Sequence, residues 1–544
     1  MILSDEQTIA DYSKTGVWGN VTLDALFRRA AQQNPQRIAL VDAPDRESWT
    51  SGAPRALTYA EAEQEIRALA GFFSAVGLEP DQIIGLQAPN TVDTVLTILA
   101  AMRAGLVVAT FPLHWRHNEV LPALVSIDAK ALITADRVET RVIAEDALAA
   151  ASDNFNLKFV FGLGKQLPDG ILEISQVINQ APEQFEEPRI HRPGQAANHI
   201  ASLTWVTTPD GPAPVPRSHN HWVAAGLMPF LETRLEAGAK ILLPYLLTGL
   251  SGWGAGLVPW LLCEGTLHLH HPLALHSLTD HARWIEADYL PVPGSLAPYL
   301  DEALQGWQTK ILAAWNTSAM PPVEYVPLGD FYDLHVAEEY GMVCRLRGKS
   351  KTPQLFDKGP LAAPSASPHA PTLISLNSTV KTTEDETRNF LSLGGAMSPD
   401  VAYPTHKFSI NFSENGFINT KIPLIESDHK ICGFGRPEAT APGIAQLDSL
   451  DEVYGAFPEI KEAAAFLVDD EIVGQRLLVA VVPQSGHFVK VDAFYAYLDA
   501  CRVSVAHYPH QILPVPSIPR TPNGAVARQQ LAEKASALKS QKVA

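Results

Sequence analysis

The chain is 544 residues long and carries 41 basic against 59 acidic residues, so its formal net charge is −18. This excess of negative charge argues against nucleic acid or an anionic membrane surface as a partner. The length exceeds what a single hydrophobic core usually serves, and 46% of the residues are hydrophobic, so we expect at least two domains.

The early chain alternates short apolar strands with helices. A strand over Leu57–Tyr59 leads into a helix whose apolar residues recur at helical spacing. A second strand, Ile83–Leu86, precedes a helix from Thr91 to Ala104 and a third strand, Val107–Phe111. This β-α-β-α-β order predicts a largely parallel sheet covered by helices.

The run TWVTTPDGPAPVPRSHNH at 204–221 is unusual for its prolines, Pro209, Pro212, Pro214 and Pro216. A loop grips phosphate by pointing successive backbone N–H groups inward, which glycine permits. Proline does the reverse, because it fixes φ and removes a donor. We therefore expect a stiff segment that has few N–H groups to offer.

The helix after this run begins with polar residues and continues with apolar ones. Ser218 is a plausible N-cap, and His219 and His221 open the helix before Trp222. Either histidine is a candidate base or ligand, although a role in the helix start explains His219 as well.

Five stretches resemble, in family order, the motifs of the adenylate-forming superfamily, which includes acyl-CoA synthetases, peptide-synthetase adenylation domains and luciferases. The run at 204–221 resembles T-S-G-T-T-G-x-P-K-G-V-x-x-S-H, and the other four are EEYGMV (338–343), ENGFINT (414–420), GFGRPEA (433–439) and PRTPNGAVAR (519–528). The resemblance implies an α/β fold: a large N-terminal AMP-binding-like domain, 1–435, with helix-covered, mostly parallel sheets, and a small, mobile α+β domain, 436–544.

The chain departs from these motifs where the family does its chemistry. Val343 and Cys344 stand at the Thr and Glu of Y-G-x-T-E, which contact phosphate and Mg²⁺ in the family. Lys421 follows Thr420 where the family has T-G-D, and Ala525 replaces the lysine that supports adenylation. Because electrostatic contacts of this kind contribute strongly to catalysis, we expect impaired adenylation and do not expect MgATP as a cofactor.

Residues that keep the pattern are the remaining site candidates. By resemblance, Thr207, Thr208, Tyr340, Gly341 and Arg436 are candidates for nucleotide or ligand binding. Tyr340 and Gly341 could border an adenine or form only a packed turn, and a hinge arginine often forms an ion pair without any nucleotide.

Two further groups of residues are candidate sites. Tyr245, Leu246 and Leu247 occupy the stretch that borders the acyl pocket in the family, which suggests an apolar lining. Alternation along a strand places His268 and His270 on one face. The histidine-rich stretch lacks cysteine and a regular ligand spacing, so we expect no metal. Polar or proline-rich composition predicts loops over 42–54 and 345–388.

Three functions remain open. The first is a diverged acyl-CoA synthetase-like protein, a pseudoenzyme impaired in adenylation that keeps an acyl, aryl or CoA-thioester pocket. The second is ATP-independent acyl transfer or thioester cleavage, with His219 or His221 as the base. The third is an active AMP-forming carboxylic acid–CoA ligase with a rearranged site. CoA or acyl-CoA is the expected small molecule, and a protein partner or homodimer is possible in the first case.

Localisation follows from what the sequence lacks. The N-terminal MILSDEQTIADYSKTG has neither a basic start nor an apolar core, and no run of about 18 apolar residues occurs. The four cysteines are spread widely, as is typical of neither a zinc site nor a disulfide framework. We expect a cytoplasmic protein.

Overall fold

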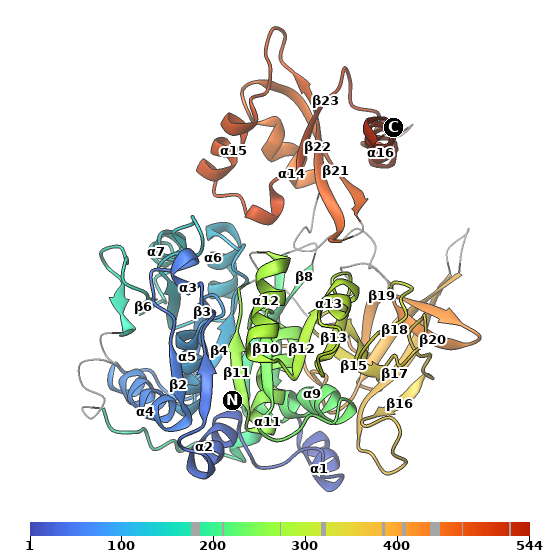
Figure 1. The fold of residues 1–544 in the computed structure, drawn as a ribbon. Coiled ribbons are helices and arrows are strands. Elements are labelled where there is room, and N and C mark those ends of the chain that lie inside the picture. Colours follow the sequence, from blue (N-terminus) through green and yellow to red (C-terminus); the bar gives the residue numbers. More distant parts are fainter. Residues whose placement is uncertain are drawn as a thin grey trace.

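The chain folds around two large β-sheets that stand side by side beneath a small C-terminal domain (Figure 1). The structure is a computed structural model, and it describes all residues except 176–184, 209–210, 272–273, 317–321, 383–386, 405–409, 436–446, 471, 522–523 and 544. The predicted α/β class with a large and a small domain is confirmed. The predicted boundary between residues 435 and 436 adjoins the undescribed 436–446 and stays a prediction.

The first large sheet has seven strands, which are parallel except for the edge strand β9. In spatial order they are β7 (Leu172–Glu173), β6 (Phe159–Leu163), β5 (Ala131–Ala135), β3 (Ile83–Gln87), β4 (Val107–Thr110), β8 (Ile200–Thr208) and β9 (Gly211–Ser218). β3 and β5 are buried along their whole length, as expected of strands with helices on both faces.

The second large sheet has eight strands, which are parallel except for its edges, β15 and β2. In order they are β15 (Gly341–Leu346), β14 (Phe331–Ala337), β13 (Lys310–Asn316), β12 (Tyr289–Pro293), β10 (Lys240–Leu243), β11 (Thr266–Leu269), β1 (Ile38–Val41) and β2 (Ala56–Thr58). The β-α-β-α-β order predicted from Leu57 onward is present. The expectation that it builds one sheet is wrong in part, because β2 pairs antiparallel with β1 here while β3 and β4 belong to the first sheet.

Local signals explain the helices that were predicted. Thr58 and Glu61 form a capping box at the start of α4 (Tyr59–Ala75). Thr91 caps α5 (Val92–Arg103), and Gly105 follows that helix with φ +74°, a conformation that favours glycine. The other helices of the large domain are α1 (Glu6–Lys14), α2 (Leu23–Gln33), α3 (Arg46–Trp49), α6 (His117–Ser126), α7 (Ile143–Ser152), α9 (His219–Glu232), α10 (Leu250–Gly252), α11 (Val258–Cys263), α12 (Leu275–Ile285) and α13 (Ala297–Ala303).

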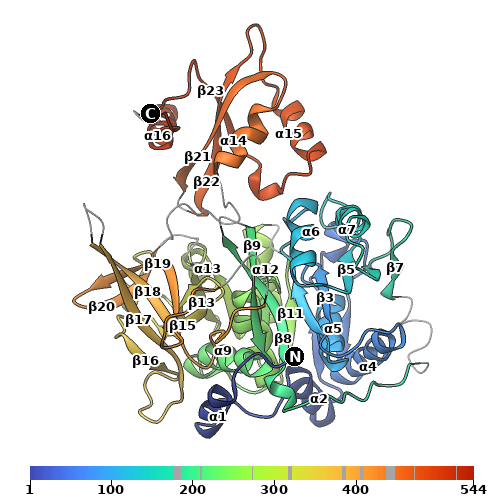
Figure 2. The same cartoon turned by 180° about the vertical axis from the view of Figure 1, so that it is seen from behind.

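A third, antiparallel sheet lies beside β15, as Figure 2 shows from behind. Its strands are β16 (Gly359–Ala362), β17 (Thr372–Thr382), β18 (Thr387–Gly394), β19 (Ile418–Ser427) and β20 (Lys430–Phe434). The loop predicted over 345–388 is therefore wrong in part, since β16 and β17 lie within it and Leu373, Ile374 and Leu376 are buried. The loop predicted over 42–54 likewise contains α3, whose Arg46 is buried against Asp42.

The small C-terminal domain is a three-stranded sheet with a core on each face. Its strands are β21 (Ile460–Asp470), β22 (Gly474–Pro483) and β23 (Gln511–Pro514), and its helices are α14 (Leu447–Gly455), α15 (Val491–Ala500) and α16 (Arg528–Val543). α14 and α15 pack on one face around Tyr454 and Phe494, and Leu531 of α16 packs on the other face. No helix in the described ranges combines the length and apolar content that crossing a membrane requires.

Polar side-chain contacts of described residues hold the small domain against the large one, among them a hydrogen bond from Asn118 Nδ2 to the Arg502 carbonyl. Arg116 Nη1 lies 2.7 Å from Asp499 Oδ1, and Ser504 Oγ donates to the His114 carbonyl over 2.8 Å. On the other side, Ser295 Oγ donates to the carbonyl of Ile472 over 2.7 Å. In this arrangement the two domains meet through polar groups rather than a shared apolar core.

Candidate functional site

The proline-rich run forms a paired hairpin rather than an open loop. β8 and β9 run antiparallel from the Ile200–Ser218 pair to the Thr208–Gly211 pair, with one irregularity beside Ile200. Thr208 Oγ1 donates to the Gly211 carbonyl over 2.7 Å, while Thr207 is exposed. Thr207 and Thr208 thus lie beside the tip, and the run is paired as a strand ladder up to Thr208 and Gly211.

The prolines of β9 occupy alternate positions along an edge strand. Pro212, Pro214 and Pro216 oppose Thr207, Trp205 and Leu203 of β8. Alternate residues of an antiparallel pair exchange ladder hydrogen bonds, so prolines at every second position cost the ladder nothing. They instead remove the N–H groups that the edge of the sheet would otherwise present outward. The stiffness expected of this segment stays a prediction.

A buried ion pair joins this hairpin to the turn between β14 and β15. The Arg217 side chain is fully buried, with Nη1 3.6 Å from Glu339 Oε2 and 3.2 Å from the Thr204 hydroxyl, to which it donates. Nη2 donates to the Glu339 carbonyl, and the guanidinium lies 4.8 Å above the Trp222 ring. Burial lowers the pKa of Arg217 to about 10, while the Glu339 charge opposes that shift.

Glu339 also holds the start of α10. Both of its carboxylate oxygens accept from the Leu250 N–H over 3.0 Å. A Cβ at Gly249 would lie only 2.5 Å from Glu339 Oε1, so this carboxylate fills the space beside the glycine. The pair therefore ties the hairpin to the turn before β15 and to the start of α10, three segments that the chain order separates. Sequence reasoning missed it, because no local pattern links Arg217 with Glu339.

The turn that carries Glu339 also carries the candidates Tyr340 and Gly341. Glu338 adopts φ +48°, an uncommon conformation for a non-glycine residue, and burial together with Glu339 raises its pKa to about 7. Tyr340 is half-buried against the main core. At Gly341 a Cβ would lie 2.5 Å from Cδ1 of Ile374, so a larger residue there would require the Ile374 side chain to shift.

The positions where the family places its phosphate and magnesium contacts lie inside the protein core. Val343 and Cys344 are both fully buried in β15, where they oppose His335 and Leu334 of β14. On β19, Ile422 is likewise buried, and Thr420 donates its hydroxyl hydrogen to the Leu391 carbonyl. At positions 343, 344 and 422 the side chains pack in the apolar core, where the family has polar side chains.

The two candidate histidines are buried at the start of α9. His219 is 2% exposed, and its Nδ1 accepts from the Leu23 N–H over 3.2 Å. His221 is 1% exposed, and its Nδ1 lies 3.1 Å from the Ser218 nitrogen and 2.9 Å from the Ser218 hydroxyl, completing a capping box. Burial lowers the pKa of each imidazole to about 4. The predicted Ser218 cap is confirmed.

The remaining candidates are spread over the two domains. Tyr245 and Leu246 are half-buried and Leu247 is buried after β10, where the Tyr245 carbonyl accepts from Asn90 Nδ2 over 2.6 Å. Arg436 lies outside the described residues. Ala525 is exposed on the small domain. The structure thus brings the hairpin and the turn at 338–341 together and leaves position 525 on the surface.

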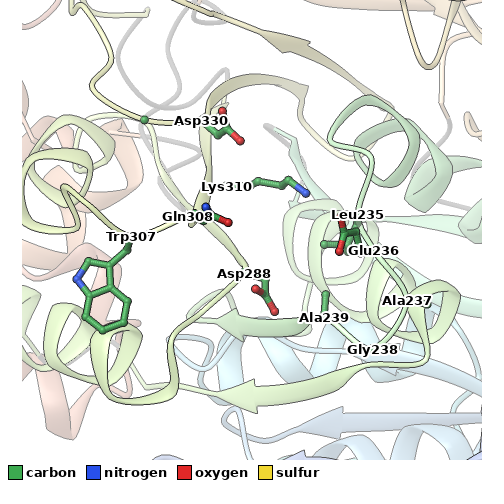
Figure 3. A pocket seen from close by; sticks show the side chains of 11 residues that line it. Leu235, Glu236, Ala237, Gly238, Ala239, Asp288, Trp307, Gln308, Lys310 and Asp330 are labelled. Atoms are coloured by element: carbon green, nitrogen blue, oxygen red, sulfur yellow. The ribbon is translucent and has the colours of Figure 1, made fainter.

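A polar cavity of about 600 Å³ opens at the opposite end of the eight-stranded sheet, where β10, β12, β13 and β14 begin (Figure 3). Lys310 extends across it toward Leu235 and Glu236, and its ammonium group donates to the Arg234 carbonyl over 3.3 Å. Ligands of parallel α/β sheets bind beyond the carboxyl ends of the strands, not at their starts. We therefore do not assign a site to this cavity.

The prediction that His268 and His270 lie on one face is confirmed. His268 and His270 both face His281 of α12, with ring centroids 6.0 Å and 5.3 Å from that of His281. Within the described parts of the chain, no group of three His, Cys, Asp or Glu side chains is placed to hold a metal ion.

Comparisons with known proteins find similarity to an AMP-binding enzyme family and to CoA ligases. Residues 27–227 match the family model described as AMP-binding enzyme. The oxalate–CoA ligase of Arabidopsis thaliana is 23% identical over 90% of this chain and 96% of its own, and a probable CoA ligase of Humulus lupulus is 22% identical over 94% and 96%.

Solved structures share the fold. The apo structure of MbtA from Mycobacterium smegmatis aligns with a TM-score of 0.61 at 19% identity, over 98% of both chains. The amide bond synthetase McbA from Marinactinospora thermotolerans aligns with a TM-score of 0.67 at 14% identity, over 94% of this chain and 99% of its own. At these identities the likeness establishes the architecture alone.

Proposed function

We propose that this chain, which belongs to the adenylate-forming superfamily, binds an acyl or aryl group, or its CoA thioester, without catalysing ATP-dependent adenylation. The observation that carries the proposal is the register of the β8–β9 hairpin. Its strands are paired up to Thr208 and Gly211, and Pro212, Pro214 and Pro216 offer no N–H group, so the described part of the hairpin has few backbone donors left for a triphosphate.

Three further positions support the same conclusion. A thiol and a branched alkyl group, Cys344 and Val343, lie buried where Mg²⁺ and phosphate would need oxygen ligands. Position 525 offers a methyl group in place of an ammonium. Losing one electrostatic contact of this kind typically costs about 3 to 4 kcal/mol of transition-state stabilisation, so several losses together remove much of a rate enhancement.

An active acid–CoA ligase remains the second candidate, and the relatives favour it. The full-length relatives named above are CoA ligases, and they match this chain over at least 90% of its length. Cleavage or transfer of a thioester has less support, because His219 and His221 are almost fully buried and their Nδ1 atoms serve the local backbone.

Calorimetry separates the first two candidates. We would titrate the purified protein with MgATP to several millimolar, and then inject CoA and a series of acyl- and aryl-CoA thioesters into the same cell. The proposal expects no heat from MgATP and saturable heat from at least one thioester. Micromolar binding of MgATP would favour the ligase assignment. If no thioester gave heat of binding, the proposed acyl or thioester pocket would be contradicted.

A further inference from the structure

The carboxylate of Glu339 lies among donors that three other segments provide. Both of its oxygens accept from the Leu250 N–H over 3.0 Å, and Oε2 lies 3.6 Å from Arg217 Nη1. Burial raises the pKa of Glu339, and Arg217, the Leu250 N–H and the Thr204 hydroxyl oppose that rise. An arginine, a hydroxyl and a backbone N–H are groups with which proteins bind carboxylates. Glu339 thus occupies the place that a carboxylate ligand would take.

Arg217 is held in place by contacts that do not involve the Glu339 side chain. Its Nη1 donates to the Thr204 hydroxyl over 3.2 Å, and its Nη2 donates to the backbone carbonyl of Glu339. The guanidinium also lies 4.8 Å above the Trp222 ring. Removal of the Glu339 carboxylate should therefore leave the cation in position. Donors that are already ordered bind a ligand at a lower entropic cost.

The place that the Glu339 side chain occupies reaches the protein surface. The Glu339 side chain is 15% exposed, whereas that of Arg217 is fully buried. On the inner side, a Cβ at Gly249 would lie only 2.5 Å from Oε1, so this glycine leaves room for the carboxylate. The 3.6 Å between Arg217 Nη1 and Glu339 Oε2 exceeds the roughly 2.7 to 2.9 Å of a charge-assisted hydrogen bond. A carboxylate that is not tethered to the turn can approach Arg217 more closely.

We propose that Arg217, Thr204 and the Leu250 N–H form a binding site for a small monocarboxylate, and that the chain closes this site with its own Glu339. The structure then shows the self-closed state. The turn that carries Glu339 is the element that must move, and Glu338 in this turn has φ +48°, which non-glycine residues seldom adopt. The site needs neither a thioester nor a nucleotide, so this proposal and the proposed function can fail separately.

The test replaces the missing carboxylate with a free one. Glu339→Ala removes a CH₂–COO⁻ fragment, so sodium acetate is the matching probe. In urea denaturation of the full-length variant, about 200 mM acetate should raise the folding equilibrium constant about twentyfold over sodium chloride at the same concentration, which corresponds to a dissociation constant on the order of 10 mM. Acetamide, a neutral molecule of similar shape, should lack this effect. The wild type, whose site is filled, should show only the general salt effect of acetate.

Glu338→Ala is the matched control, because it removes a carboxylate from the same turn that has no hydrogen bond or ion pair to a described residue. It too should show only the general salt effect. The double variant Arg217→Met/Glu339→Ala keeps the vacated space but lacks the cation, so acetate should not stabilise it specifically. If Glu339→Ala is unfolded in chloride, Glu339→Ser is the second variant, and recovery of the near-ultraviolet circular dichroism in acetate is the readout.

Four results overturn the proposal. The first is an equal response of Glu339→Ala and Glu338→Ala to acetate, and the second is an equal effect of acetate and acetamide on Glu339→Ala. The third is undiminished stabilisation of the double variant by acetate. The fourth is that Glu339→Ala and Glu339→Ser are both unfolded in chloride and acetate refolds neither.

Discussion

The guanidinium of Arg217 and the carboxylate of Glu339 meet in the interior, 122 residues apart in the chain, with Nη1 and Oε2 separated by 3.6 Å. Arg217 lies near the end of β9 in the proline-rich hairpin, and Glu339 sits in the turn between β14 and β15. The ion pair therefore joins the run at 204–221 to the turn at 338–343. These are two of the motifs that, by resemblance to the superfamily, would bind the nucleotide.

The first prediction concerns the stability that this pair provides. Arg217→Met should lower the free energy of unfolding by about 3 kcal/mol or more, because it leaves the Glu339 carboxylate without its cation. Glu339→Gln keeps an acceptor for the Leu250 N–H and should cost less. In urea denaturation the double variant should lose less than the sum of the two single losses. Strict additivity would mean that the two side chains do not interact.

The second prediction concerns pH and His335, whose imidazole is fully buried between Phe356 and Phe434. Burial lowers its pKa from 6.5 to about 4. The unfolded chain therefore binds a proton first as the pH falls, so stability present above pH 6.5 is lost toward pH 4. His335→Phe should retain about 2 kcal/mol more of its neutral-pH stability at pH 5 than the wild type retains.

Urea midpoints measured from pH 7.5 to pH 5 check this slope. His369→Gln, at an exposed position, is the control and should follow the wild-type profile. Parallel profiles for the wild type and His335→Phe would show that His335 is not held neutral by the fold.

The third prediction concerns the missing lysine. Ala525→Lys alone should not restore pyrophosphate exchange, because under the proposed function the paired hairpin does not hold the triphosphate and Cys344 offers no oxygen ligand to Mg²⁺. The measurement is exchange of labelled pyrophosphate into ATP with a panel of carboxylic acids. Exchange above the wild-type level in this single variant would show that the hairpin still admits the triphosphate.

The sequence was sufficient where local signals act. Thr91 and Gly105 bracket α5, and the predicted helix from Thr91 to Ala104 differs from the observed one only by its capping residues. Ser218 was likewise predicted from the sequence as the N-cap of α9. Such elements are specified by neighbours within one turn of helix, so no tertiary information is required.

The sequence was insufficient where partners are distant or composition misleads. The proline-rich stretch before Thr372 suggested a long loop, yet antiparallel pairing within the third sheet gives β16 and β17. His270 and His281 were recognised as part of a histidine-rich stretch, but only the crossing of α12 over β11 shows that their Nδ1 atoms touch. Pairings across a sheet depend on the whole fold rather than on spacing along the chain.

The last prediction concerns the contact between the domains. Arg116 bridges Asp146 of the large domain, which is almost buried, and Asp499 of the small domain, whose side chain is 70% exposed. Asp499→Asn therefore removes the attraction across the interface and leaves the Arg116–Asp146 pair in place. An exposed pair of this kind contributes about 0 to 1 kcal/mol and is screened by salt.

Asp499→Asn should accordingly favour separated domains by at most about fivefold at low salt, with a smaller effect at 1 M NaCl. Small-angle scattering measures this as an increase in the radius of gyration. Asp153→Asn is the matched control, since Asp153 is an exposed carboxylate that pairs with His117 within the large domain. A larger radius in both variants would show that the expansion does not depend on the Arg116–Asp499 contact.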